Sequence, residues 1–229
     1  MKIDLKFYQK NTLNLLLLGN SALCVALLFF RLYATGEPHF FFLAWNLILA
    51  WIPFLLSKMI TKSNRKARSF RTVLLFFLWL IFFPNALYII TDLFHFHQRT
   101  MVPLWFDLVL ILSFAWNGLM LGFISLMEIQ KFLSKKFGSQ TGFRVAMILL
   151  IISAFGIYLG RYLRWNSWDL FINLYQLYLD VEDRFMHPMK HPRTIGVTIL
   201  FALFLTMSYT TFFYLVNNKQ EKNELEGDH

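Results

Sequence analysis

Long apolar stretches separated by short polar segments dominate the sequence. Six of them are long enough to cross a bilayer, and they cover residues 13–33, 40–57, 72–91, 104–127, 145–163 and 194–216. A helix rises about 1.5 Å per residue, so roughly 20 apolar residues match a hydrocarbon core about 30 Å thick. The pattern predicts an all-α fold, a polytopic membrane bundle of about six transmembrane helices. We expect residues 1–217 to form a single integral membrane domain and residues 218–229 to form a polar cytoplasmic tail.

The segment between the fifth and sixth spans is too long to be a simple connection. Within residues 164–193, apolar side chains recur at spacings of three and four, which is the period of an amphipathic helix. They are Leu170, Phe171, Leu174, Leu177, Tyr178 and Val181. Trp165 and Trp168 come first, and tryptophan favours the headgroup region of a membrane. We predict a helix that lies flat on the membrane surface or covers one end of the bundle.

The distribution of basic residues predicts an orientation. Fifteen of the 22 Lys and Arg residues fall in the N-terminal segment, the 58–71 and 128–144 connections and the C-terminal tail. Cytoplasmic segments carry an excess of such residues, so both termini are expected in the cytoplasm, and residues 34–39, 92–103 and 164–193 are expected to face outward. The same distribution accounts for the net charge of +9, so no nucleic-acid partner is expected.

Composition and motifs exclude several classes of protein. With 57% apolar and 15% charged residues, the chain is too apolar for an ordinary soluble enzyme. The one cysteine, Cys24, lies in the first span, which excludes an intramolecular disulfide and a multi-cysteine zinc site. The sequence contains no Walker A motif, no dinucleotide-binding glycine motif and no Gly-x-Ser-x-Gly or His-Glu-x-x-His motif.

The end of the third span carries the most informative polar residues, Asp92, His95 and His97. If the helix continues, Asp92 and His95 share a face; if it unravels, His95 and His97 point the same way. Either arrangement suits an acid and base pair or a divalent metal. A metal needs at least three protein ligands, such as Asp92, His95 and His97, and the third ligand could also come from Asp107, from Asp169 or from the His187 and His191 pair. The alternative is an interfacial polar pair that hydrogen-bonds neighbouring helix ends.

Further ionisable residues are expected at the same membrane face. Asp107 and Asp169 are candidate catalytic carboxylates, although each also suits the first turn of a helix. In that alternative, Asn166 is the N-cap of the surface helix and Asp169 lies at its third position. Arg161 and Arg164 lie three residues apart and can clamp an anion, with Asn166 as a further substrate-binding candidate. The structural alternative for both arginines is a favourable position at a helix C-terminus.

Other polar and small residues within the spans are interpreted as packing features. Pro84 lies in the middle of the third span and predicts a kink, and Asn85 can bond the carbonyl groups that the proline leaves free. Two glycine pairs, Gly118 with Gly122 and Gly156 with Gly160, predict close helix packing, and Asn46 and other buried amides can bridge helices.

Several of these residues form a recognisable pattern. It comprises residues 46–53, the series Pro84-Asn85, Tyr88, Thr91-Asp92-Leu93 and His95, then Trp105-Phe106-Asp107 and residues 160–169. Over roughly residues 40–215 the chain resembles the bacterial multi-pass membrane proteins grouped as domain of unknown function 1361. This chain has Trp105-Phe106-Asp107 where that family has Trp-Tyr-Asp. The resemblance implies a bacterial cytoplasmic-membrane protein of unassigned activity.

The leading functional hypothesis is a membrane enzyme that acts on an anionic envelope lipid or a lipid-linked substrate. Arg161 and Arg164 would hold an anionic headgroup, and Asp92 and His95 would serve as acid and base or bind a metal. The alternatives are a transporter or permease component, with helices broken at Pro53 and Pro84, and a non-catalytic assembly partner. The lipid bilayer is the one partner expected with each of them, and the sequence does not predict the oligomeric state.

Overall fold

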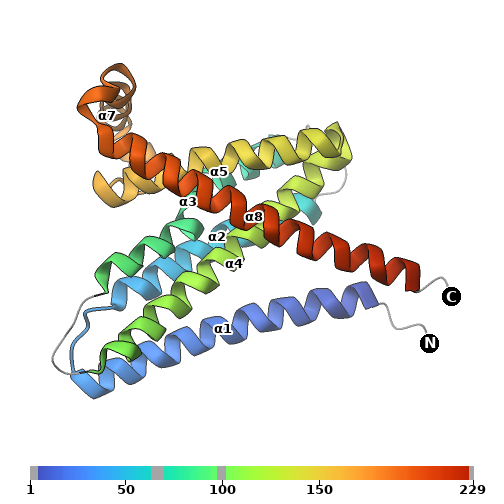
Figure 1. The fold of residues 1–229 in the computed structure, drawn as a ribbon, viewed down its shortest axis with the longest axis horizontal. Coiled ribbons are helices and arrows are strands. Elements are labelled where there is room, and N and C mark those ends of the chain that lie inside the picture. The colour runs from blue at the N-terminus through green and yellow to red at the C-terminus, as the bar shows by residue number, and fades with distance from the viewer. Residues whose placement is uncertain (1–4, 63–69, 97–101, 227–229) are drawn as a thin grey trace.

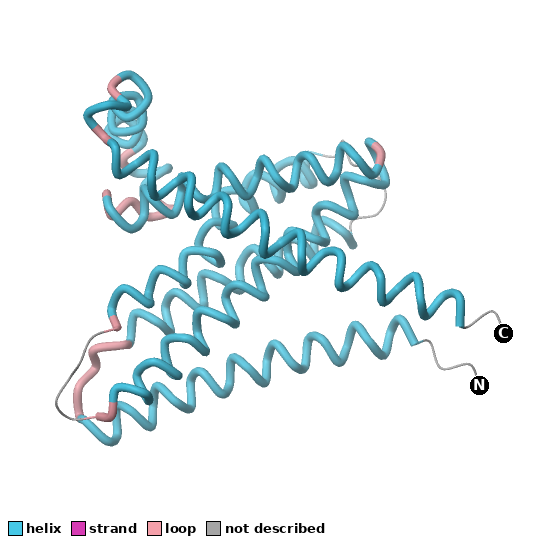
Figure 2. The backbone as a smooth tube through the Cα atoms, viewed as in Figure 1, coloured by secondary structure: helices cyan, strands magenta, loops and turns pink. Residues whose placement is uncertain are grey.

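The computed structural model describes residues 5–62, 70–96 and 102–226, and it describes side chains from residue 12 to residue 218 within those ranges. All regular structure in the described residues is helical (Figure 2). The long helices are α1 (Leu5–Thr35), α2 (Phe41–Lys62), α3 (Phe70–Tyr88), α4 (Leu104–Phe137), α5 (Ser139–Tyr162) and α8 (Pro192–Glu226). The short helices are η1 (Ile89–His95), which continues α3, and α6 (Asp169–Ile172), α7 (Leu174–Met186) and η2 (Pro188–Lys190).

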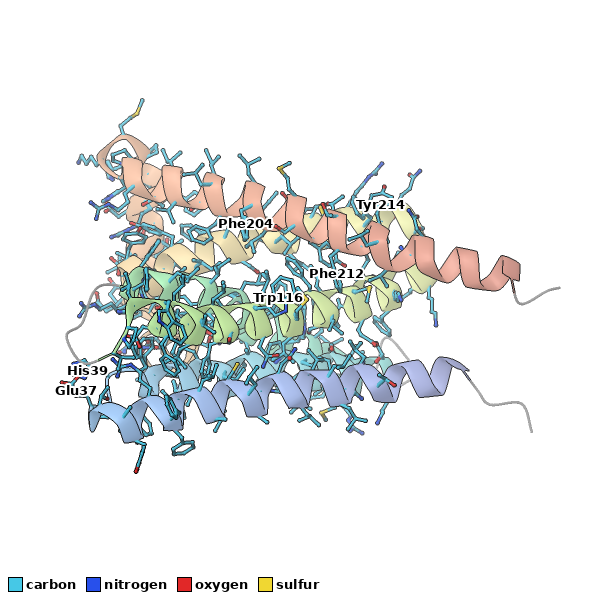
Figure 3. The ribbon with its side chains drawn as sticks, turned by 60° about the horizontal axis from the view of Figure 1, so that its bottom comes forward. Glu37, His39, Trp116, Phe204, Phe212 and Tyr214 are labelled. Atoms are coloured by element: carbon cyan, nitrogen blue, oxygen red, sulfur yellow. The ribbon has the colours of Figure 1, made fainter. Side chains whose placement is uncertain are left out.

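Within the described residues, six helical stretches are long and apolar enough to cross a membrane, which confirms the predicted all-α polytopic bundle. Helix α4 contacts α1, α2, α3 and α5 and holds much of the core (Figure 1). Helices α1 and α8 lie on opposite sides of the bundle in Figure 3. The ends of α1 and α8 that lead to the chain termini are at one end of the bundle, and α7 is at the other. Figure 3 places Glu37 and His39, between α1 and α2, at the same end as α7.

Several helices extend further than their apolar residues predict. Helix α4 continues to Phe137 and α5 begins at Ser139, so most of the expected 128–144 connection is helical. The reversal takes place at Gly138, whose φ of 92° is accessible to a residue without a side chain. Helix α8 likewise continues into the polar tail as far as Glu226. Polar residues with good helix propensity prolong a helix beyond its apolar part, because exposed helical turns need no buried partner.

The last turns of α3 are held between two glycine pairs. A Cβ atom on Gly118 of α4 would lie 2.7 Å from the side chain of Ile89 and 3.0 Å from the carbonyl oxygen of Ala86. On the other side, a Cβ atom on Gly160 of α5 would lie 3.2 Å from the ring of Tyr88. The glycines therefore have the packing role predicted for them, and they fix the position of η1.

Both membrane-embedded prolines lie inside continuous helices, Pro53 in α2 and Pro84 in α3. The prediction that Asn85 bonds the freed backbone directly is wrong. Asn85 donates to Oγ of Ser167 at 2.8 Å, and Ser167 donates to the carbonyl oxygen of Ile81 at 3.1 Å. A serine from the α5–α6 connection thus supplies the hydrogen bond next to the proline, and it ties that connection to α3.

The amphipathic segment forms two helices, α6 and α7, which meet at Asn173. Leu177 is the buried residue of α7, and a broad apolar surface around it is exposed. This surface comprises Phe171, Ile172, Leu174, Tyr175 and Tyr178. Asp180 anchors α7, because it accepts a hydrogen bond from Nε1 of Trp165 at 2.8 Å. Within α7 it also accepts one from Arg184 at 3.0 Å.

The C-terminal end of α7 is tied to the segment that leads into α8. Oxygens of the Asp183 carboxyl lie 2.7 Å from Nε2 of His191 and 3.1 Å from Nδ1 of His187. These hydrogen bonds, first that of His191, lower the pKa of Asp183. The carboxylate form therefore persists below the ordinary titration range of aspartate, and the anchor is lost only as the pH falls through that lowered pKa.

Candidate functional site

Asp92 and His95 lie on one face of η1, at the end of the bundle that carries α7. This segment is a 3₁₀ helix with three residues per turn, so residues three apart lie directly above one another. The side chain of Asp92 is 1% exposed, and that of His95 is half-buried. Of the two arrangements left open by the sequence, the structure has the one that pairs Asp92 with His95, and His97 lies outside the described residues.

Arg161, in the last turn of α5, joins the two residues. Its Nη1 lies 2.9 Å from Nε2 of His95 and 3.9 Å from Oδ1 of Asp92. Asn46 of α2 donates to Oδ2 of Asp92 at 2.8 Å. These four residues, here named the Asp92 cluster, come from three separate elements of the bundle.

Aromatic rings flank the cluster. The guanidinium of Arg161 lies 5.2 Å from the ring centre of Phe94, and the ring centres of Phe42 and His95 are 4.8 Å apart. A guanidinium carries only donors, so in this hydrogen bond Nε2 of His95 must be the acceptor. His95 is therefore held with an unprotonated Nε2, and the lone pair of that nitrogen is occupied by Arg161.

A cavity of about 400 Å³ lies next to the cluster and shares Asn46 with it. Its walls come from α2, α3 and α5, and residues 165–167 together with Leu170 and Leu177 cover it. Its polar lining consists of Asn46, Asn85, Tyr88, Asn166 and Ser167, together with the indole groups of Trp45 and Trp165. The remaining lining is apolar. This size and this mixture of many apolar and few polar groups are typical of small-molecule and lipid sites.

The other predicted site residues lie apart from the Asp92 cluster. Oδ1 and Oδ2 of Asp107 accept hydrogen bonds from Arg31 of α1 at 2.7 and 3.3 Å, and the guanidinium lies 4.4 Å from the ring centre of Phe40. Asp169 accepts a hydrogen bond from the backbone N–H of Asn166 at 2.7 Å. Asp169 is the first residue of α6 and Trp168 is its N-cap, so the prediction of an N-cap at Asn166 is wrong. Asp107 and Asp169 thus each belong to a separate network.

The two remaining substrate-binding candidates differ in position. Asn166 is exposed and lines the cavity. Arg164 is exposed too, and its φ of 62° is unusual for a residue other than glycine. This backbone conformation ends α5 and lets the N–H of Trp165 bond the carbonyl oxygen of Leu159 at 3.2 Å. The turn at Arg164 thereby directs residues 165–167 over the cavity.

The geometry gives little support to the metal hypothesis. No group of three His, Cys, Asp or Glu side chains with the proximity needed for a metal occurs in the described part of the chain. One candidate for the third ligand, His97, lies outside the described residues. Moreover, the cationic Arg161 contacts both Asp92 and His95, and a second cation between them would be repelled by the guanidinium.

Sequence reasoning missed two functional partners. It assigned Asn46 to helix packing alone and gave no partner to Arg31, which is 2% exposed. The signal for Arg31 was present, because a lone arginine within an apolar span requires a buried partner. No comparable signal in the sequence pairs Asn46 with Asp92, since that contact depends on how α2 is rotated against η1.

A sequence model for one family, described as "Protein of unknown function (DUF1361)", matches residues 45–208. The chain belongs to this family. The DUF1361 region includes all four residues of the Asp92 cluster and every residue that lines the cavity. It excludes α1, so Arg31 contacts the DUF1361 region from outside it. No curated protein and no solved structure matches the chain.

Proposed function

We propose that this multi-pass membrane protein is an enzyme that acts on the headgroup of an anionic envelope lipid or a lipid-linked substrate. The observation that carries the proposal is the meeting of Asp92, His95 and Arg161 at one end of the bundle, beside a largely apolar cavity of about 400 Å³. Asn46 belongs to both the cluster and the cavity. A substrate with an apolar tail and a charged head matches that combination.

The proposed chemistry begins with an exchange of partners at Arg161. A phosphate or carboxylate group can accept two parallel hydrogen bonds from one guanidinium. Such an anion binds the guanidinium more strongly than a neutral imidazole does. An anionic headgroup would therefore draw Arg161 away from His95 and release the lone pair on Nε2. His95 would then take a proton from an attacking water or hydroxyl and return it to the leaving group. Asp92, held by Asn46, would act as a positioning residue for Arg161.

The proposed location is the bacterial cytoplasmic membrane, with both termini in the cytoplasm and the Asp92 cluster at the outer face. The excess of Lys and Arg in the connections at the terminal end of the bundle supports this orientation. The resemblance of the chain to bacterial multi-pass membrane proteins supports the bacterial origin. An outer-face site suits a lipid substrate, because the outer leaflet presents its headgroups at the depth of η1.

The two alternatives have less support. A transporter with a site at the membrane midplane requires interrupted helices, whereas α2 and α3 run through Pro53 and Pro84 without a break. An assembly partner would use the Asp92 cluster only to hold helices together. The enzyme proposal accounts for both the Asp92 cluster and the cavity beside it, whereas the assembly-partner alternative gives no role to the cavity.

The test is a turnover assay with three lipids of different headgroup chemistry. Purified protein is placed in nanodiscs that contain phosphatidylglycerol, phosphatidic acid or undecaprenyl phosphate, and lipid products are followed by mass spectrometry. We expect the wild type to convert one of the three. We expect His95→Gln and Arg161→Lys to lower the rate by about 100-fold or more, since lysine cannot reproduce the two-armed contact.

The matched control is Arg193→Lys, a conservative change at an exposed arginine of α8. It should leave the rate unchanged. Thermal unfolding in detergent checks that each variant is folded. The enzyme proposal is wrong if the wild type converts none of the three lipids, or if the rates of His95→Gln and Arg161→Lys fall only in proportion to the amount of folded protein. The latter result would favour the assembly-partner alternative.

A further inference from the structure

A second cavity, of about 580 Å³, lies between α5, α8 and the α7–η2 segment. It is separate from the Asp92 cluster, and no residue of that cluster lines it. Its walls are mainly aliphatic and aromatic, with Ile151, Ile195 and Ile199 along the spans and Phe185 from α7. A cavity with such walls at the edge of a membrane bundle suits hydrocarbon chains.

Three polar atoms in this apolar cavity have no hydrogen-bond partner within the described structure. They are Oγ1 of Thr194, Oγ1 of Thr198 and Nε of Arg184, and all three residues line the cavity. Thr194 is 7% exposed. Buried polar groups are nearly always hydrogen-bonded, because an unpaired one destabilises the folded state. Three such donors in one cavity therefore point to a missing acceptor.

Other threonines of the same helix behave differently. Thr206 and Thr211 each donate to the carbonyl oxygen four residues earlier, at 2.7 and 3.0 Å. This is the usual way in which a helix satisfies a threonine in an apolar environment. Thr194 and Thr198 make no such bond, so their hydroxyl groups are buried without a partner in the described structure.

The charge of Arg184 is already neutralised by the protein. Its Nη1 lies 3.0 Å from Oδ1 of Asp180 and 3.6 Å from Oδ2 of Asp183. Two carboxylates beside one guanidinium leave no attraction for an anionic ligand at this point. The unpaired Nε–H is therefore suited to a neutral acceptor, such as a carbonyl oxygen.

The depth of the three donors identifies the kind of acceptor. Thr194 lies in the first turn of α8, beside the surface segment that contains α7, so it lies near the boundary of the hydrocarbon. Thr198 is one turn deeper, by about 6 Å. The ester carbonyl groups of a phospholipid lie at this boundary, between the headgroups and the acyl chains.

We propose that this cavity binds one diacyl phospholipid through its ester groups. Thr194, Thr198 and Nε–H of Arg184 donate to the ester carbonyl oxygens, and the acyl chains lie along the isoleucines of α5 and α8. Recognition by ester groups is indifferent to headgroup charge. The lipid links α7 to the two spans below it. This proposal does not rest on the enzymatic one.

The test compares two lipids that differ only in the proposed acceptor. Binding of diester and diether phosphatidylglycerol with equal chains is measured by native mass spectrometry of the detergent-solubilised full-length protein. The diether lipid has no carbonyl oxygens. We expect the wild type to prefer the diester by about fivefold or more, as two or three hydrogen bonds predict. The Thr194→Val, Thr198→Val double variant should lose this preference.

The matched control is Thr206→Val, Thr211→Val, in which the two changed threonines of α8 have partners in the protein. It should keep the preference, and so should Thr194→Ser, which retains the hydroxyl and remains informative if the double variant does not fold. Replacement of the glycerol headgroup by ethanolamine should change the affinity by less than about twofold. Equal binding of the two lipids by the wild type, or a preference that follows headgroup charge, would overturn the proposal.

Discussion

Arg31 and Asp107 form a buried ion pair between α1 and α4, with 2% and 4% of their side chains exposed. Helix α1 packs mainly on α4, so this pair is a principal polar attachment of the first span. The paired charges lie among apolar groups, and removal of one partner would leave the other uncompensated. Such an uncompensated charge is more costly than the loss of the pair as a whole.

We expect Asp107→Ala to lower the free energy of unfolding by roughly 3–5 kcal/mol, because Arg31 would remain buried without a counter-ion. The double variant Arg31→Met, Asp107→Leu should lose clearly less than Asp107→Ala alone. Reversible unfolding in detergent micelles measures both values. A loss in the double variant as large as that of Asp107→Ala, or larger, would show that the ion pair does not couple α1 to α4.

The pairing of individual ionisable residues is where prediction from the sequence fails. The positions of Asp92, Asp107, Arg161 and Asp169 at one membrane face follow from counting residues along helices. Whether two of them meet depends on the rotation of each helix about its axis, which residue counting does not give. Asp107 is therefore a candidate for the same site as Asp92 by residue counting, yet the structure pairs it with Arg31.

Among the elements, α3 is closely packed on two sides, because glycines of α4 and α5 approach it. The contact at Gly118 involves the carbonyl oxygen of Ala86, which is backbone and cannot move aside alone. Any group larger than hydrogen at this position must displace α3 or α4. Since η1 continues α3, that displacement reaches Asp92 and His95.

We expect Gly118→Ala to destabilise the protein by about 1–3 kcal/mol through overpacking. The control Gly196→Ala, in α8, meets no atom within 4 Å and should be neutral or stabilise by up to about 1 kcal/mol, because alanine favours the helix. Unfolding in detergent micelles compares the two. Equal effects of the two substitutions would show that the close approach of α3 and α4 is not needed.

The existence and number of the membrane helices follow from the sequence, because apolar length alone decides whether a segment can cross a bilayer. Their ends do not. Helix α4 continues ten residues past its expected end at residue 127, and the surface segment breaks at Asn173 into two helices. These details depend on contacts with neighbouring elements, such as the bond from Trp165 to Asp180, that local sequence does not specify.

On the scale of the whole molecule, the six spans give the bundle two chemically different ends. The end near the chain termini has the salt bridge between Lys58 and Glu128, at 2.7 Å, and the α4–α5 reversal. The opposite end has α7, both cavities and the Asp92 cluster. The proposed function requires that this second end face outward.

The orientation predicts which residues a membrane-impermeant maleimide can reach in intact cells. Cys24 is 1% exposed and should not react, and Cys24→Ala provides a background without cysteine. On that background, Glu37→Cys should be labelled from outside, and Lys136→Cys only after the membrane is permeabilised. Lys136 is exposed and the side chain of Glu37 is 44% exposed, so access depends on the side of the membrane. The reverse labelling pattern would show that the bundle has the opposite orientation.

The seven residues of η1 make the geometry of the candidate site depend on helical winding. In a helix of three residues per turn, His95 stands directly above Asp92, so one guanidinium reaches both. With 3.6 residues per turn, His95 would rotate about 60° away from Asp92 over the same three residues. A change of η1 from 3₁₀ to α-helical hydrogen bonding would therefore separate Asp92 from His95 without moving any membrane span.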